Sequence, residues 1–294
     1  MKQMKKKGLL ERNSAWDYVI MLFLVIAAVI CIIPFWYVFT VSFSDPLLAR
    51  EGVLTLLPKG FTLGAYKIIF RQNRFFNALY ISLVRTIFGG FINLLLQVTF
   101  AYALSQKKLV GQKYFKLMVI FTMLFNGGMI PTFMIVRYTG ILDTIWALII
   151  PNAISTWNVI ILMSFFDGIP AEINESAYID GAGDFTIFLK LIVPLSVPGI
   201  AVVSLYIAVN HWNSLMDAVL YVNKTNYKPL QNYLMDMVVN NQMEDVMSTM
   251  DGLNTSTLGI QTAAIFASTI PILLVYPFVQ KFFVKGLMIG AIKG

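Results

Sequence analysis

Long apolar stretches recur six times along this chain of 294 residues, and each is long enough to cross a lipid bilayer. A bilayer core of about 30 Å takes roughly 20 helical residues, and the six stretches are 18–43, 76–104, 115–136, 145–166, 191–209 and 258–283. Backbone inside lipid must satisfy its own hydrogen bonds, and a helix does so within one segment. The sequence therefore predicts an all-α membrane protein with six transmembrane helices.

Composition agrees with a chain that is solvated by lipid. Hydrophobic residues make up 58% of the sequence and charged residues only 13%, too few to cover a soluble domain of this length. The formal net charge is +7, but the basic residues flank apolar stretches and line no polar face. This pattern is typical of membrane flanks and argues against nucleic-acid binding.

The basic residues also predict an orientation. They cluster before residue 18, in the short loop that holds Lys107 and Lys108, and near the C-terminus, which places both termini in the cytoplasm if six helices alternate. Basic residues in the first outer connection weaken this asymmetry. The expected organisation is a cytoplasmic segment 1–17, a six-span transmembrane domain 18–284 with long outer connections 44–75 and 210–257, and a cytoplasmic tail 285–294.

Two features suggest local departures from regular spans. Prolines lie in or at the ends of several apolar stretches, and Asn126-Gly127-Gly128 is a weak point in the third; broken helices suit a bundle that changes shape around a cavity. In the second long outer connection, apolar residues of 229–238 recur at helical spacing, which predicts a short amphipathic helix on or in the outer face.

The loop 167–190, expected on the cytoplasmic side, has the pattern of a helix, a corner and a second helix. Pro170 suits a first helical position, and Gly181 and Gly183 end the helix because glycine adopts a left-handed turn cheaply. Asp184 is expected to cap the second helix, whose apolar face would be Phe185, Phe188, Leu189 and Ile192. Ala177 and Gly181 leave a bare face for close approach by another protein, with Ile173 as an apolar knob.

The spacing Glu175-x-Ala177-x3-Gly181-x12-Pro194 resembles the "EAA" loop of permease subunits in binding-protein-dependent ABC importers. Ser176 replaces the usual central alanine. The resemblance implies that the first helix of the loop docks on a cytoplasmic ATPase and transmits its motion. The implied coupling residues are Ile173, Glu175, Ser176, Ala177, Asp180, Gly181 and Pro194, together with Lys293 and Gly294 of the tail.

The resemblance extends over nearly the whole chain and indicates the carbohydrate branch. Residues 77–104, Met129-Ile130-Pro131, 140–144, Trp212-Asn213 and 280–294 are similar to corresponding parts of the smaller permease of maltose-type importers, with the closest likeness to the complex-oligosaccharide subgroup. The implied partners are a second, different permease, two ATPase subunits that bind ATP and Mg, and an extracellular solute-binding protein. The implied location is the bacterial cytoplasmic membrane, and the implied cargo is a sugar or oligosaccharide.

No chemistry of its own is expected from the chain. It lacks a Gly-x4-Gly-Lys-Ser/Thr segment, so ATP hydrolysis is expected only on partner subunits. Gly181-Ala182-Gly183-Asp184 superficially fits intramembrane aspartyl proteases, but that chemistry needs two aspartates at membrane depth. Cys31 and His211 are the single cysteine and histidine, and no cluster suggests a metal site. The sequence predicts no enzyme, no metal and no cofactor on this chain.

Sugars bind through hydrogen bonds and aromatic stacking, which gives a set of candidate cavity residues: Asn126, Asn152, Trp157, Asn158, Tyr206, Asn210 and Trp212. Membrane-interface aromatics and interhelical asparagines explain the same residues equally well. Arg85 in the second apolar stretch either snorkels to the interface or pairs with another group, or it lines a cavity. His211 is either a hydrogen-bonded interface residue or part of a proton relay.

Two rival functions stay open at this point. A permease for a peptide or an osmolyte would share the same loop. An ion-coupled secondary transporter would need a complete pathway with repeated helix sets and buried ionisable residues, and six spans with one intramembrane arginine argue against it.

Overall fold

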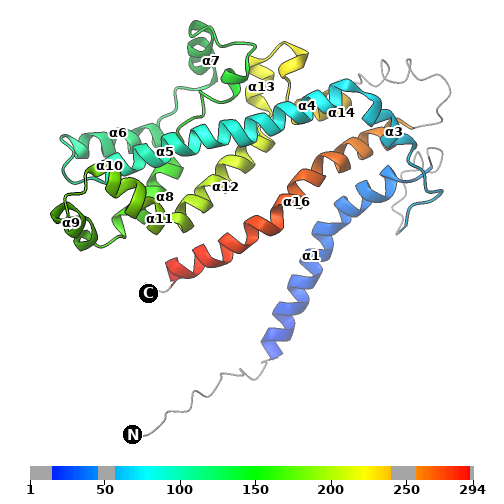
Figure 1. Cartoon of the computed structure of the whole chain (residues 1–294). Coiled ribbons are helices and arrows are strands. Elements are labelled where there is room, and N and C mark those ends of the chain that lie inside the picture. Colours follow the sequence, from blue (N-terminus) through cyan, green and yellow to red (C-terminus); the bar gives the residue numbers. More distant parts are fainter. Residues whose placement is uncertain (1–14, 46–56, 240–255, 292–294) are drawn as a thin grey trace. The chain divides into compact units, whose positions relative to one another are not determined.

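The structure, a computed structural model, describes residues 15–45, 57–239 and 256–291, and of 276–291 the backbone alone. Within these ranges the ordered elements are all helical (Figure 1). They form two units, one of residues up to Ile68 with Gly252–Phe266, the other of Ile69–Asp251 with the residues from Ala267 on. The prediction of an all-α chain is therefore confirmed for the described residues.

The first unit contains α1 (Ala15–Ser42), the start of α3 (Gly64–Arg71) and the start of α16 (Thr257–Ala291). Aromatic rings join these segments: Phe39 lies 5.4 Å and Phe43 6.0 Å from Phe266, and Phe43 lies 4.8 Å from Tyr66, measured between ring centroids. The Tyr66 hydroxyl donates to Ser42 Oγ at 2.8 Å. The apolar side chains of α1 before this cluster are almost all exposed, so this helix is built to be covered by lipid or by another subunit.

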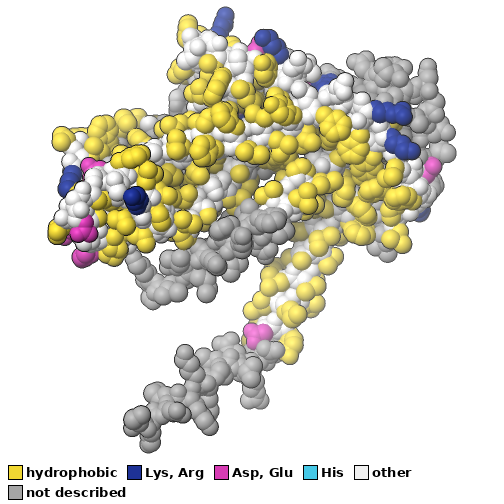
Figure 2. All heavy atoms as spheres, viewed as in Figure 1, with side chains coloured by type: hydrophobic (Ala, Val, Ile, Leu, Met, Phe, Trp, Pro, Cys, Tyr) yellow, Lys and Arg dark blue, Asp and Glu magenta, His cyan; other side chains and the backbone are white. Residues whose placement is uncertain are grey.

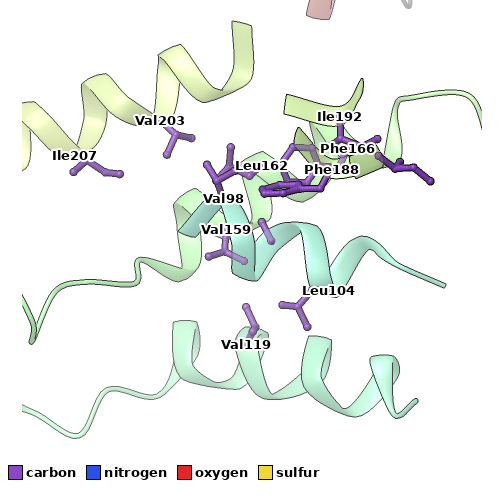
Figure 3. Close-up of a cluster of buried hydrophobic side chains, with 12 residues drawn as sticks. Val98, Leu104, Val119, Val159, Leu162, Phe166, Phe188, Ile192, Val203 and Ile207 are labelled. Atoms are coloured by element: carbon purple, nitrogen blue, oxygen red, sulfur yellow. The ribbon is translucent and has the colours of Figure 1, made fainter. Parts of the chain in front are cut away.

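One long helix organises the second unit. It runs through α4 (Asn73–Val84), the π-helix η1 (Arg85–Gly89) and α5 (Gly90–Ser105), which is about 50 Å at 1.5 Å per residue. On α5 pack α8 (Thr156–Asp167) and α12 (Val197–Asn213). The buried core between them is apolar (Figure 3) and includes Val98, Leu104, Val119, Val159, Leu162, Phe166, Phe188, Ile192, Val203 and Ile207.

The third apolar stretch is broken, as its glycines predicted. The chain bends by 116° between helices α6 (Gln112–Leu124) and α7 (Met129–Tyr138). Gly128 between them has a φ of +87°, a conformation that only glycine adopts without strain. The Asn126 side chain fixes the turn, because its Oδ1 accepts the Gly128 N–H at 2.8 Å.

The fourth expected span, 145–166, is wrong as a continuous helix. The chain forms a short 3-10 helix, η2 (Ile145–Leu148), then turns, and α8 begins only at Thr156. Pro151 lies in the break; it has no N–H to donate and disfavours helical backbone in the residue before it. Two side chains of α5 donate hydrogen bonds to backbone carbonyls in the break. Asn93 donates to Asn152 O at 3.3 Å and Gln97 to Ala153 O at 2.9 Å.

The fifth span is also bent. It comprises α10 (Asp184–Ile187), the π-helix η3 (Phe188–Ile192) and α11 (Val193–Leu195), followed after an 81° bend by α12. Pro194 and Pro198 flank Ser196 at the bend. In the described residues three helices are long and apolar enough to cross a membrane, and five spans result if each bent pair counts as one.

The amphipathic helix expected at 229–238 is present as α14 (Leu230–Val238), which packs on α4. Leu230, Tyr233 and Met237 are buried, and the Tyr233 hydroxyl donates to Gln72 Oε1 at 2.8 Å. Arg74 pairs with Asp236 beside it. Between α12 and α14 lie α13 (Met216–Tyr221) and the 3-10 turn η4 (Thr225–Tyr227).

The surface of the second unit is mostly apolar. In the face that Figure 2 presents, hydrophobic side chains cover much of the helices, and charged side chains gather at the end where α9 (Ala171–Ile179) and α10 lie and around α7 and α13. Apolar flanks with charged ends are the pattern of a protein embedded in a bilayer.

Candidate functional site

The corner between α9 and α10 forms as its glycines predicted. Gly181 follows α9 with a φ of +81°, and the corner is closed by backbone bonds from Gly181 N to Tyr178 O at 3.0 Å and from Ala182 N to Ala177 O at 2.9 Å. Such paired bonds satisfy the free carbonyls at a helix end. No atom lies within 4 Å of the position where a Gly181 Cβ would stand, so this side of the corner is open.

Two details of the predicted loop are wrong. Pro170 is the residue before α9 and not its first helical residue, and Gly183, not Asp184, precedes the first residue of α10. The Asp184 carboxylate is engaged elsewhere, since its Oδ1 accepts the hydroxyl of Tyr178.

The faces of α9 also differ from the expectation. Ala177 and Tyr178 pack against the chain's own apolar core, and Ile173 is half-buried. Residues three or four apart share a helix face, so Ile173 and Ala177 both turn toward this chain. The small Ala177 therefore permits close packing of α9 on the chain's own core.

The outward face of α9 and its corner carries the other predicted coupling residues. Glu175, Ser176, Asp180 and Gly181 are exposed, and Ile179 is 86% exposed. Ile179 is thus the most exposed large apolar side chain of α9, and it was not among the predicted coupling residues. Lys293 and Gly294 lie outside the described residues, and Pro194 is exposed in α11, away from this corner in sequence.

The apolar face predicted for the second helix is only half right. Phe188 and Ile192 are buried, but Phe185 is 72% exposed and Leu189 48%, whereas Ile187 is buried. The π-helix η3 contributes at Leu189, which lies within it, because its wider turn rotates residues away from the positions that a 3.6-residue period assigns. The proline that follows contributes, since Pro194 cannot donate to a carbonyl in the preceding turn. Phe185 precedes η3, and its exposure has no such cause.

A small polar pocket lies in the apolar second unit, between α5, the 150–155 break, α8 and α12. Its lining is Arg85, Asn93, Gln97, Asn152, Ser155, Asn158, Ile207, Asn210 and His211. The cavity volume is about 20 Å³, room for about one water molecule and too little for a sugar ring. Asn93 Oδ1 and Gln97 Oε1 are buried there without a hydrogen-bond donor among the described residues, so the pocket has acceptor capacity to spare.

A charged network closes one side of this pocket. Arg85, which is 1% exposed, pairs with Asp217 of α13. Its Nε donates to His211 Nδ1 at 3.2 Å, and Asn93 contacts His211 Nε2 at 2.8 Å. Arg85 thus pairs with another group and also lines the pocket, two of the alternatives that its sequence left open.

The predicted cavity residues divide into two groups. Asn152, Asn158 and Asn210 line the pocket, whereas Trp157 and Tyr206 face outward, Trp212 is buried elsewhere and Asn126 serves the α6–α7 turn. Sequence reasoning missed Asn93 and Gln97. The signal was available, because two amides four residues apart in an apolar span share one helix face and are costly in lipid. The described residues hold no cluster of metal-binding side chains.

Comparison with known proteins decides the family. Over 285 residues the chain is 42% identical to the polygalacturonan/rhamnogalacturonan transport system permease protein YtcP of Bacillus subtilis, covering 96% of this chain and all of that protein. The chain belongs to the family of carbohydrate ABC-importer permeases. This permease is also 39% identical to protein LplC of Bacillus subtilis, over 97% of each chain. No protein-family model matches it.

A solved structure supports the same assignment. A chain in the crystal structure of a bacterial ABC transporter involved in the import of the acidic polysaccharide alginate superposes with a TM-score of 0.87 at 32% identity, covering 92% of this permease and 99% of that chain. A bacterial alginate ABC transporter in complex with alginate pentasaccharide-bound periplasmic protein shares the fold, with a TM-score of 0.61 at 15% identity. The protein is thus a membrane permease subunit of an ABC importer for oligosaccharides or polysaccharides.

Proposed function

We propose that this permease imports an oligosaccharide beside a second, different permease, and that two cytoplasmic ATPase subunits drive it through α9. The observation that carries the proposal is the exposed corner of α9: a left-handed Gly181 with open space around it, next to Glu175, Ser176, Ile179 and Asp180. Ile179 is 86% exposed between the polar and charged side chains of this corner, and protein interfaces combine an apolar centre with a polar rim.

ATP then acts by favouring one of two arrangements of the permease pair. Closure of the ATPase dimer draws the docked α9 helices together and opens the sugar pathway to the outside, and hydrolysis returns it to the inside. A ligand shifts such an equilibrium only through different affinities for the two states, so the contact at α9 must differ between them. The permease itself performs no bond chemistry, and ATP and Mg bind to the partners.

We further propose six spans with both termini in the bacterial cytoplasm. The helix α8 is then a short fourth span, which at 12 residues is about 18 Å long and is completed by the 145–155 segment. The tail residues Lys293 and Gly294 are proposed as a second contact to the ATPases. A binding protein outside the cell delivers the sugar.

The proposed cargo is an oligosaccharide from an acidic polysaccharide. The relative from Bacillus subtilis is named for polygalacturonan and rhamnogalacturonan, and the superposable structure is named for alginate. Asn152, Asn158 and Asn210 are proposed to bind sugar hydroxyls when α8 and α12 separate. Purified binding protein from the same bacterium is offered separate digests of these three polysaccharides, of a neutral glucan and of a protein. It should retain the acidic sugar fragments; retention of peptides instead would favour the rival cargo.

The docking proposal is tested by Gly181→Asp with Gly140→Asp as its matched control. Both glycines have positive φ, +81° and +72°, and open space around them, and aspartate tolerates this conformation better than most residues. Gly181→Asp is expected to insert into the membrane normally but to lose the co-purifying ATPase, whereas Gly140→Asp keeps it. If the Gly181→Asp permease co-purifies with as much ATPase as the unmodified chain, the docking proposal is wrong.

A further inference from the structure

If α9 is a lever, the corner beside it is a weak point. Helix α9 has nine residues, and a helix of this length is marginal without tertiary support. Its link to α10 passes through Gly181, around which the space is open. A push on α9 could therefore bend the corner and be lost before it reached a membrane span.

One hydrogen bond spans this corner directly. The Tyr178 hydroxyl, in the last turn of α9, donates to the Asp184 carboxylate at the first residue of α10. Bonds from a hydroxyl to a carboxylate are among the strongest in proteins. The bond to Asp184 raises the pKa of Tyr178 to about 12, with burial and the negative charge of Asp184 as further causes.

The same two residues are tied to the end of the long helix. Lys108, in the loop after α5, lies with its Nζ 3.8 Å from the centroid of the Tyr178 ring, a cation–π contact. Tyr102 of α5 donates from its hydroxyl to the Asp184 carbonyl at 3.4 Å and packs its ring 4.6 Å from that of Phe188. Two consecutive elements, α9 and the start of the fifth span, thus meet the end of the second span, which is distant in sequence, at Tyr178 and Asp184.

We propose that Tyr178 and Asp184 are positioning residues that clamp α9 to the ends of the second and fifth spans, so that motion of α9 is delivered to both. This inference rests on the proposed docking of α9, and it adds which side chains carry the motion onward. The Tyr178 hydroxyl stiffens the corner, and Lys108 and Tyr102 fix the stiffened corner to α5.

The test measures whether α9 and the α5 loop move as one body. Spin labels are placed at Ala171→Cys and Val110→Cys in a Cys31→Ser chain, because residues 171 and 110 are exposed and lie outside the predicted docking residues. The complete transporter is reconstituted in lipid nanodiscs, and the distance distribution is recorded without nucleotide and with ATP and vanadate. With Tyr178 present, the distribution is expected to stay the same in both states.

Tyr178→Phe removes the hydroxyl and keeps the ring, and Asp184→Asn removes the charge and keeps the shape. Each is expected to add a second distance population with ATP and vanadate only, raised about tenfold or more over the unmodified chain, as loss of a hydrogen bond to a charged group implies. Tyr114→Phe is the matched control, since Tyr114 lies in the first turn of α6 and is 77% exposed. It should leave the distribution unchanged.

The outcomes separate the two proposals. If Gly181→Asp releases the ATPase but Tyr178→Phe and Asp184→Asn keep the single distribution, the clamp is refuted and the docking stands. If both clamp variants show the second population without nucleotide, or fail to assemble, the pair holds the fold and does not transmit motion, which also overturns the clamp. If Gly181→Asp keeps the ATPase, the docking fails and the clamp falls with it.

Discussion

Arg85 and Asp217 form an ion pair that is shut off from water inside an otherwise apolar unit, with side-chain exposures of 1% and 6%. Taking such charges out of water costs several kcal/mol per ion, and the pair offsets this only while both partners are present. Arg85 also donates hydrogen bonds to the backbone carbonyl of Ser214 and to the ring of His211. The pair joins the second span to α13 and thereby closes the polar pocket.

We predict that Asp217→Asn destabilises the permease by about 3–5 kcal/mol, because it leaves a buried guanidinium without its counter-charge. Thermal unfolding in nanodiscs measures this. Asp236→Asn is the control, since its partner Arg74 is 37% exposed, and partly solvated pairs contribute less. The double variant Arg85→Met/Asp217→Leu should recover much of the loss; equal losses for Asp217→Asn and Asp236→Asn would contradict this account of the pocket wall.

Tyr178 gives a prediction in pH. Its pKa is raised to about 12 by the bond to Asp184, so the folded chain holds a proton that an unfolded tyrosine, with a pKa near 10, releases. The stabilisation is therefore complete below pH 10 and is lost as the pH rises from 10 to 12.

The groups that face this phenol are Asp184, Tyr102 and Lys108. The absorbance of phenolate, recorded as the difference between the unmodified chain and Tyr178→Phe, should rise with a midpoint near pH 12 and not near 10. Asp184→Asn should move this midpoint toward 10, and an unmoved midpoint would show that Asp184 is not the cause.

At the scale of elements, breaks in the helices set the architecture of the pocket. The turn after α6 at Gly128, the gap before α8 at Pro151 and the bend after α11 at Ser196 interrupt three of the six apolar stretches. Freed backbone groups inside lipid need partners, and Asn93 and Gln97 of α5 supply two of them. The pocket therefore forms where α5 meets the gap before α8.

We predict that close contact between α8 and α12 depends on Gly199. A Cβ at this position would stand 2.4 Å from ring atoms of Phe165, so Gly199→Ala should destabilise the fold by about 1–3 kcal/mol, the usual range for overpacking. Gly90→Ala is the control within a neighbouring helix, because its Cβ would meet Ile207 at 3.7 Å, an ordinary contact. The thermal unfolding midpoints of the two variants test this prediction. Equal midpoints would contradict the close contact between Gly199 and Phe165.

The sequence predicted correctly those elements that depend on a single glycine or on the helical spacing of apolar residues. The corner at Gly181, the turn at Asn126-Gly127-Gly128 and the amphipathic helix α14 were all predictable, because glycine conformation and helical spacing are local properties. The two π-helices were not, and Leu189, which lies within η3, falls outside the predicted buried face. The fourth stretch was predicted as continuous because apolar length was counted there and Pro151 was treated as a kink.

The polar pocket could not be predicted from the sequence, because its residues come together only through tertiary contacts. Arg85 and Asp217 are 132 positions apart, and no local pattern pairs them. Asn152, Asn158 and Asn210 were predicted because sugars bind amides, but Trp157 and Tyr206 were predicted by the same reasoning and lie exposed. Residue type alone could not decide which side of a helix meets the gap before α8.

At the scale of the whole molecule, the chain is a permease with much of its apolar surface uncovered. The side chains of α1 are exposed along most of its length, which suits lipid and a second permease as neighbours. The outward face of α9 carries the exposed residues Glu175, Ser176 and Asp180 beside the 86% exposed Ile179, and it is the surface where we propose that the ATPase docks. The central claim is that a separate ATPase binds there.

Cross-linking from Ile179 tests this claim most directly. The transporter is purified with its partners from cells that carry Ile179→Cys in a Cys31→Ser chain, and a short thiol-to-amine cross-linker is added. We predict one cross-linked product containing the ATPase subunit, and none from Tyr138→Cys, which is similarly exposed at 81% on α7. Cross-linking of the ATPase from position 138 but not from 179, or from neither, would contradict the account.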